Sequence, residues 1–198
     1  MWASRVFLLL PLAAKVLASP ALVPESGVPG YGVHELQWEV EVFPGQVMNF
    51  TGTVESVDRQ AAALNPTYKE EYLARNPDVS AEKTLDARWI QGSWKMIYCK
   101  PGHGWEMGDR DAAKDGIKYL QGVPGEPASS PGPGMCGRVS CSYDTAIWWC
   151  NDNPRWKRLE SFGRIAQGAE MILKACVMAL GQHFATDNWN VIIRKDYC

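Results

Sequence analysis

The sequence predicts an α+β domain braced by disulfide bonds, and three observations predict that class. Residues 36–42 alternate apolar and polar side chains, and residues 93–99 carry Trp94, Met96 and Tyr98 at every second position, as strands do. Residues 159–180 place apolar side chains every three or four positions, which is typical of an amphipathic helix. All six cysteines lie at or after position 99 of the 198-residue chain. We therefore expect an antiparallel or mixed sheet of about four strands, packed by two or three helices.

The first 34 residues are predicted to lie outside the folded domain. Residues 1–18 have a basic end, an apolar stretch and small or apolar residues before a cut after Ala18, which is the pattern of a signal peptide. The apolar stretch is interrupted by Pro11 and Lys15 and is too short to span a bilayer. Residues 19–34 are rich in Pro and Gly and are predicted to form a flexible leader. Residues 35–198 then form a single domain.

The net charge and the cysteine content limit the cellular compartment and the classes of binding partner that are expected. Two basic and no acidic residues lie in the predicted signal peptide, so its removal lowers the formal net charge from -2 to -4. Such a charge disfavours general nucleic-acid binding. No later stretch approaches the roughly 20 apolar residues that cross a membrane, so no stable membrane insertion is expected. An even number of cysteines after a signal peptide predicts a secreted, extracellular protein with three disulfide bonds.

Capping and chain-breaking residues predict the remaining elements. Thr53, Asp109 and Asn153 are suitable N-cap residues, and Pro154 suits the first turn of a helix. Four prolines and several glycines make residues 122–135 a long loop within the domain. The expected elements are helices at 54–64, 110–121 and 154–180, the last ended by Gly181, a partly buried turn of helix within 67–85, and strands at 36–42, 93–99, 139–150 and 188–194.

Three segments of the chain resemble a known group of proteins. They read "EVFPGQVMNFTGTVESV", "GMCGRVSCSYDTAIWWCNDNP" and, after Cys176, "NWNVIIRKDYC". Together they resemble the small secreted cysteine-rich proteins of filamentous fungi, many of which are effector candidates. The resemblance covers most of the mature chain and rests on cysteine placement, the "WWCNDN" turn and the terminal strand. It implies an extracellular fungal protein with an antiparallel sheet flanked by helices, similar to the killer-toxin-like α/β sandwiches, and it carries no catalytic residue.

One position is predicted to be glycosylated. Asn49-Phe50-Thr51 is an acceptor sequence for N-glycosylation in a secreted protein, whereas Asn65-Pro66-Thr67 has proline at the forbidden middle position. We expect Asn49 to lie in an exposed polar link between a strand and a helix and to carry a glycan. The alternative is an unused acceptor sequence.

A candidate binding surface lies on both sides of Cys150 in the sequence. Two adjacent tryptophans on a strand point to opposite faces, so one enters the core and the other is covered by the Pro-rich loop or exposed. An exposed tryptophan can stack on sugar rings, although packing by the loop is favoured. Cations crowd the predicted helix N-terminus, where they suit an anionic partner, although a solvated, ion-paired surface is the favoured interpretation. The surface comprises Trp148, Trp149, Arg155, Trp156, Lys157 and Arg158.

Metal and cofactor sites are not expected. Asp109, Asp111 and Asp115 could be mistaken for a calcium loop, but Ala113 stands where an oxygen ligand is needed. No C-x-x-C, G-x-S-x-G or H-E-x-x-H motif is present, and no cysteine has a histidine at ligand spacing. The three histidines are far apart in the sequence: His34, His103 and His183.

Two functions remain after these exclusions. The favoured hypothesis is a secreted effector-like or toxin-like interaction protein without enzymatic activity. It would bind an unknown host or cell-wall component, with carbohydrate as one candidate, outside the producing cell. The alternative is a small secreted hydrolase acting on carbohydrate or RNA, because histidines or carboxylates distant in sequence can meet in a fold.

The disulfide pairing is predicted from the direction of the chain, which must choose among 15 possibilities. A helix that follows Cys150 and runs back over the sheet places Cys176 near Cys141, at the start of the preceding strand. A terminal strand that runs in the same direction as that earlier strand places Cys198 near Cys150, at the end of the earlier strand. The predicted pairs are Cys141–Cys176, Cys150–Cys198 and, by elimination, Cys99–Cys136.

Overall fold

The α+β class is confirmed by a computed structural model, which describes residues 26–77, 94–100 and 102–198. The described residues form four helices and ten strands in two sheets, with three disulfide bonds. The strands are more numerous than the sequence predicts. In chain order the elements are β1 Gly32–Val33, β2 Gln37–Phe43, β3 Gln46–Thr51, α1 Val54–Leu64, α2 Tyr68–Arg75, β4 Trp94–Tyr98, α5 Arg110–Gly122, β5 Ala128–Ser129, β6 Met135–Ser142, β7 Thr145–Asn151, β8 Lys157–Arg158, α6 Gly163–Ala175, β9 Gly181–Ala185 and β10 Trp189–Lys195.

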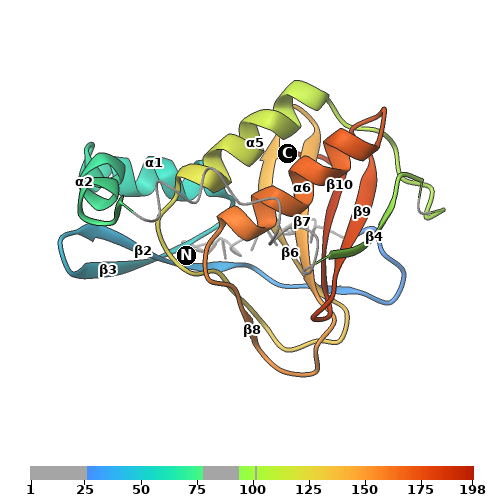
Figure 1. Ribbon diagram of the computed structural model, residues 1–198, viewed down its shortest axis with the longest axis horizontal. Coiled ribbons are helices and arrows are strands. Elements are labelled where there is room, and N and C mark those ends of the chain that lie inside the picture. Colours follow the sequence, from blue (N-terminus) through green and yellow to red (C-terminus); the bar gives the residue numbers. More distant parts are fainter. Residues whose placement is uncertain (1–25, 78–93, 101) are drawn as a thin grey trace, which may run out of the picture.

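The larger sheet has six strands in the order β1-β6-β7-β10-β9-β4. Its neighbours pair antiparallel except for β1 and β6, which are parallel. Helices α5 and α6 lie side by side across one face of this sheet (Figure 1). Ile165, Ala169 and Ile172 of α6 are fully buried in the same core as Val191 and Ile193 of β10. This helix-covered face is the main hydrophobic core.

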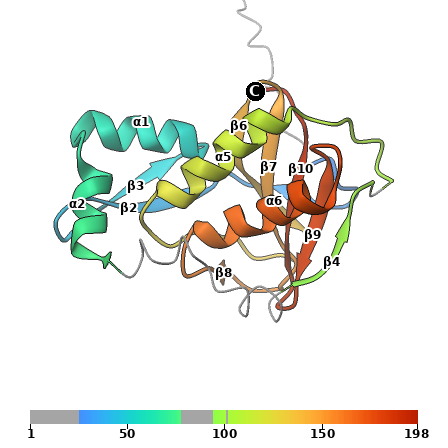
Figure 2. The ribbon, with the colours of Figure 1, turned by 45° about the horizontal axis from the view of Figure 1, so that its top comes forward.

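The smaller sheet has the order β3-β2-β5-β8, and α1 lies along its β2–β3 hairpin (Figure 2). The predicted inner face of the first strand is confirmed, because Trp38, Val40 and Val42 are buried. Trp38 stacks on Phe162, which directly precedes α6, with 4.3 Å between ring centroids. This contact joins the smaller sheet to the main core.

The opposite face of the larger sheet is covered by residues 26–33. Ser26 and Val28 are buried, and β1 pairs with β6. Gly27 has φ of +70°, and a Cβ there would lie 3.0 Å from the indole nitrogen of Trp105. Residues 26–34, assigned above to a leader, are therefore packed into the fold, and the domain begins no later than Ser26. The predicted signal peptide and residues 19–25 lie outside the described residues.

The strand predicted at residues 139–150 is instead a hairpin of β6 and β7. Its turn is formed by Tyr143 and Asp144, whose φ angles are 45° and 53°. Two successive residues with positive φ give the kind of turn whose twist matches an antiparallel hairpin. The prediction missed the turn because Tyr-Asp lacks the glycine that usually marks it.

The long helix is shorter at both ends than the sequence predicts. It begins at Gly163 instead of Pro154, and it ends at Ala175, while Gly181 starts β9 instead of capping the helix. Asn151 and Asn153 explain the late start, because their side chains bond to backbone that is distant in the sequence. Asn151 Nδ2 donates to the carbonyl of Ser130 at 3.0 Å, and Asn153 Nδ2 donates to that of Asn188 at 2.7 Å. These bonds fix a loop where an N-cap was expected.

The three predicted disulfide pairs are wrong. Strand β10 runs antiparallel to β7, with Lys195 opposite Thr145, so the chain ends at the start of β7 and not at its end. Cross-strand register in the β6–β7 hairpin places another cysteine pair directly opposite each other. The observed pairs are Cys99–Cys176, Cys136–Cys150 and Cys141–Cys198, with Cα–Cα distances of 5.4, 4.0 and 5.5 Å.

Candidate binding site

The predicted surface of two tryptophans does not exist, because Trp148 and Trp149 are both fully buried. They point to opposite faces of β7 as expected: Trp149 belongs to the helix-covered core and Trp148 to the smaller cluster on the other face. A buried ring has no face available to a sugar. The binding role assigned to these two residues is therefore wrong.

Trp148 is covered by the packed N-terminal segment and by charged side chains, and not by the Pro-rich loop. Val28 and Tyr31 contact its cluster. The guanidinium groups of Arg138 and Arg194 lie 5.9 and 5.5 Å from its ring centroid. Its indole nitrogen donates to Asp196 Oδ2 at 3.1 Å. Cation–π contacts and a satisfied N–H account for burying this ring on the second face.

The basic residues of the predicted surface lie in a loop and in β8 near the edge of the smaller sheet (Figure 1). Because α6 begins at Gly163, the argument from cations at a helix N-terminus no longer applies. Lys157 pairs with Asp187, and Arg158 lies 3.4 Å from Glu39 and 3.6 Å from Glu126.

Trp156 is the exposed tryptophan of the predicted surface. It is 67% exposed beside Arg155, whose side chain is also exposed. These two residues, together with the exposed but ion-paired Arg158, are what the fold leaves accessible of the predicted surface.

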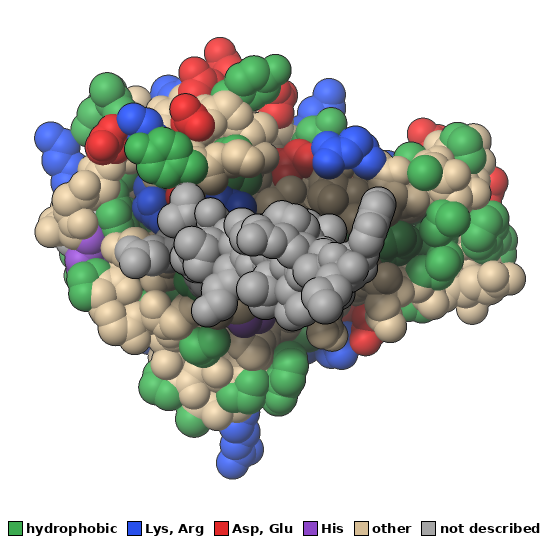
Figure 3. Space-filling view, turned by 180° about the vertical axis from the view of Figure 1, so that it is seen from behind, with side chains coloured by type: hydrophobic (Ala, Val, Ile, Leu, Met, Phe, Trp, Pro, Cys, Tyr) green, Lys and Arg blue, Asp and Glu red, His purple; other side chains and the backbone are tan. Residues whose placement is uncertain are grey.

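Asn49 is exposed, but it lies within β3 and not in a link between elements. It faces Glu39 across the hairpin, on the side away from the buried ring of Trp38. Hydrophobic side chains gather at this end of the molecule (Figure 3), and Val47, two residues away on the same side, is 61% exposed. Occupancy of the glycosylation site stays a prediction.

The three histidines have different surroundings. His183 is buried and stacked on Trp94, with 4.1 Å between ring centroids, and burial lowers its pKa. His34 lies 3.4 Å from the hydroxyl of Ser129, and burial also lowers its pKa. His103 lies beside Trp105.

Of the aspartates that resemble a calcium loop, Asp109 is instead the N-cap of helix α5. Asp109 caps α5, because its Oδ1 accepts from the backbone N–H of Asp111 and of Ala112, both at 2.8 Å. Capping satisfies N–H groups that the helix itself leaves free. Within the described ranges no group of three His, Cys, Asp or Glu side chains is arranged to hold a metal ion.

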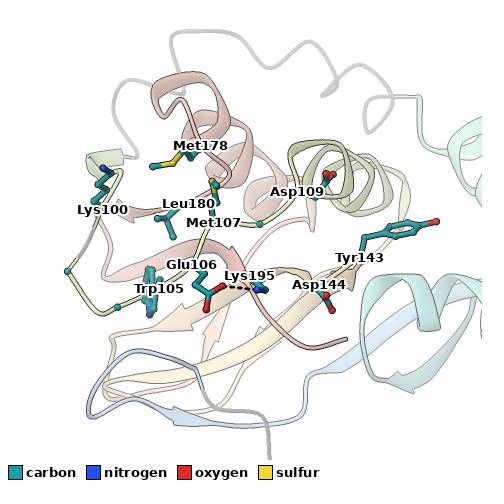
Figure 4. Close-up of a pocket in the computed structure, with 13 residues that line it drawn as sticks. Lys100, Trp105, Glu106, Met107, Asp109, Tyr143, Asp144, Met178, Leu180 and Lys195 are labelled. Carbon is teal, nitrogen blue, oxygen red and sulfur yellow. Dashed lines mark hydrogen bonds and ion pairs between the residues drawn. The ribbon is translucent and has the colours of Figure 1, made fainter.

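The concave site of interest is a pocket of about 690 Å³ that the sequence analysis did not predict (Figure 4). It lies beside the turn between β6 and β7 and close to the C-terminal end of β10. Four separate segments contribute to it, none of which is distinctive in the sequence. Its lining residues are Lys100, Gly102, Gly104, Trp105, Glu106, Met107, Gly108, Asp109, Tyr143, Asp144, Met178, Leu180 and Lys195.

The middle of the pocket is apolar. Met107 is 59% exposed, and Met178, Leu180 and Trp105 lie around it (Figure 4). Trp105 is fixed by its indole nitrogen, which donates to the carbonyl of Gly27 at 2.5 Å. The two walls are tied together because Gly108 donates its N–H to the carbonyl of Ala179 at 3.0 Å. Hydrogen bonds to other parts of the fold therefore hold the apolar side chains of the pocket in place.

Several ionisable groups of the pocket are already used by the fold. Glu106 and Lys195 form an ion pair at 2.7 Å and share a backbone hydrogen bond of 2.9 Å. The hydrogen bond between them lowers the pKa of Glu106 and raises the pKa of Lys195. Asp109 is held by its capping bonds.

Two charged side chains of the pocket remain available. Lys100 follows β4, and Asp144 belongs to the β6–β7 turn; within the described part of the chain neither side chain makes a hydrogen bond or an ion pair. Figure 4 shows them at opposite ends of the pocket, with the apolar side chains and the Glu106–Lys195 pair between them.

Comparisons with protein-family models, with curated proteins and with solved structures found no match for this chain. In the described residues, no helix has both the length and the apolar character that crossing a bilayer requires. The site is therefore interpreted from its own geometry.

Proposed function

We propose that this chain is a secreted interaction protein of effector-like or toxin-like type, which binds its target through the pocket between β4, the β6–β7 turn and β10. The three disulfide bonds support an oxidising, extracellular location. The resemblance to secreted cysteine-rich proteins of filamentous fungi supports a fungal source and a target outside the producing cell, either a host or a cell-wall component.

One observation carries the proposal. The pocket combines an accessible apolar centre with Lys100 and Asp144, two charged side chains that form no hydrogen bond or ion pair with the described residues. Ligand sites typically have volumes of roughly 300–1,000 Å³, with a mostly apolar lining and a few polar groups that fix orientation. The pocket has both properties.

A hydrolase is the second candidate, because Glu106, Asp109 and Asp144 line the same pocket. A glycosidase needs one carboxyl group with a raised pKa as its general acid. The pKa of Glu106 is instead lowered by its hydrogen bond to Lys195. Asp109 Oδ1 is engaged as the cap of α5, where it accepts two backbone N–H bonds. Glu106 and Asp109 are therefore engaged in structural interactions and are not placed to donate a proton.

The test is a binding measurement of the mature protein on immobilised host extracellular proteins and cell-wall polysaccharides. We expect saturable binding that Met107→Glu reduces at least tenfold, because a charge is introduced in the apolar centre. Val47→Glu is the matched control, since it puts the same charge at an exposed apolar residue of β3.

Two results would contradict the proposal. Binding that survives Met107→Glu but is lost in Trp156→Ala would move the site to the loop before β8. Turnover of RNA or polysaccharide by homogeneous protein that is lost in Asp144→Asn would favour the hydrolase.

A further inference from the structure

The chemistry of the pocket also identifies the class of ligand that fits it, and this inference rests on the binding function proposed above. Lys100 and Asp144 carry charges of opposite sign at opposite ends of the pocket (Figure 4), and neither forms an ion pair with the described residues, although Asp144 acts on Lys195 at longer range. Lys100 offers an ammonium group to an anion, and Asp144 offers a carboxylate to a cation. A ligand that satisfies both carries a negative and a positive group with a separation between them.

The centre of the pocket selects against a polyhydroxylated ligand. A sugar needs hydrogen-bond partners for its hydroxyl groups, because burying them without partners is costly. The indole N–H of Trp105 is already bonded to Gly27, and the N–H of Gly108 is bonded to Ala179. Glu106 and Lys195 are bonded to each other. Met107, Met178 and Leu180 offer no hydrogen-bond donor, so a sugar at the centre would depend on the remaining capacity of the ion-paired Glu106 and Lys195.

The same centre suits a large apolar side chain. Met107 and Met178 are unbranched and polarisable, so they adapt their shape to an aliphatic or aromatic group. Leu180 is nearly buried beside them. An apolar group placed here removes hydrocarbon surface from water on both sides.

We propose that the occupant of the pocket is a segment of a partner protein in which a large apolar side chain stands between an acidic and a basic residue. The acidic residue pairs with Lys100, the apolar side chain contacts Met107, and the basic residue pairs with Asp144. Amino-acid chains supply this sequence of charges and apolar groups, whereas neutral polysaccharides supply neither charge.

The probes are capped peptides in which Leu is separated from Glu and from Lys by one to three glycines, in both chain directions. Binding to the full mature protein is followed by the ¹³C-methyl NMR signals of Met107 and Met178. We expect the best mixed-charge peptide to bind at least fivefold more tightly than peptides with two Glu or two Lys. Replacing its Leu with Ser should abolish the shifts.

Charge reversal in the protein provides the decisive variant. Lys100→Glu should transfer the preference from mixed-charge peptides to peptides with two Lys, a change that a purely structural role would not produce. Asp144→Asn should reduce binding of the mixed-charge peptide at least threefold, and Asn tolerates the positive φ of this turn. Circular dichroism and urea unfolding verify that both variants keep the fold.

The outcomes separate this inference from the function on which it rests. Peptides that bind without charge preference, or Met shifts produced by chitin or glucan oligomers and not by peptides, would overturn the peptide assignment alone. Binding of the natural target that persists in Met107→Glu would show that the target does not bind in the pocket.

Discussion

The Cys141–Cys198 bond gives a quantitative test of how the chain is held together. Its partners are separated by 57 residues, and neither side chain is fully buried. Replacing both with Ser therefore removes the crosslink while leaving little cavity in the core. The chain-entropy treatment of a loop of this length gives a loss of about 4 kcal/mol in the free energy of unfolding.

The assay is equilibrium unfolding in urea, followed by tryptophan fluorescence and circular dichroism. For a chain of this size, the loss corresponds to a decrease of roughly 8–16 °C in Tm, at about 2–4 °C per kcal/mol. The m-value should rise, because the unfolded chain without the crosslink is more expanded and exposes more surface.

A second variant separates the crosslink from the side chains that form it. The chain ended at Asp196 and carrying Cys141→Ser lacks the bond and also Tyr197, which is largely exposed. Its stability should match that of the double Ser variant within about 1 kcal/mol, because it also loses the exposed hydrogen bond that Arg138 donates to the carbonyl of Tyr197. A loss below about 1 kcal/mol in both variants, with an unchanged m-value, would refute the loop-closure reasoning.

Three other predictions test individual positions. Asn49→Gln should lower the intact mass of the secreted protein by one glycan with less than about 0.5 kcal/mol change in unfolding free energy, and an unchanged mass would show that the site is unused. Trp156→Ala should likewise change stability by less than about 0.5 kcal/mol, whereas Trp149→Ala should cost about 3–5 kcal/mol because its ring is fully buried; urea unfolding would contradict the burial pattern if the order were reversed. Burial lowers the pKa of His183 below its unfolded value, so stability should be complete above about pH 6.5 and should fall as the pH decreases below it; His183→Gln should reduce this dependence between pH 7 and 5, leaving the contribution of His34, and an unaltered slope would contradict the assignment.

The class of fold and much of the secondary structure could be predicted because the relevant signals are local. The alternation from Leu36 to Val42 reflects a sheet with one face in the core, and that face is buried. Asp109 caps α5 through bonds to the first turn of its own helix. Such signals involve residues within a few positions of one another, so tertiary structure did not change their meaning.

The disulfide pairing failed because strand β9 was not predicted: the sequence pattern made Gly181 the cap of the preceding helix and the residues after it a loop. Strand β9 follows α6 and pairs antiparallel with β10, so the chain reverses once more than the prediction allowed. That reversal sends Cys198 to the end of the sheet where Cys141 lies, away from Cys150. The apolar spacing of residues 176–185 did not distinguish a short buried strand from the end of a helix.

The pocket could not be predicted because it has no local pattern. Lys100 and Asp144 are ordinary polar residues in the sequence, 44 positions apart, and their significance comes from lying on either side of an apolar centre without an ion-pair partner among the described residues. Trp148 gave the opposite difficulty, because its chemistry suggested a binding role while tertiary packing buried it. Its cover comes from the N-terminal segment, which the sequence pattern assigned to a leader.

The position of β1 has a consequence for the order in which the domain assembles during synthesis. Gly32 pairs with Met135, so the segment that leaves the ribosome early must wait for a partner made about 100 residues later. At translation rates of about 5–20 residues per second, that interval lasts roughly 5–20 s. Until then the N-terminal segment has no strand to pair with, and the side of the sheet bearing Trp148, which is made later still, is not yet there for it to cover. Closure of the N-terminal segment is thus a late folding event that completes both the second face and one wall of the pocket.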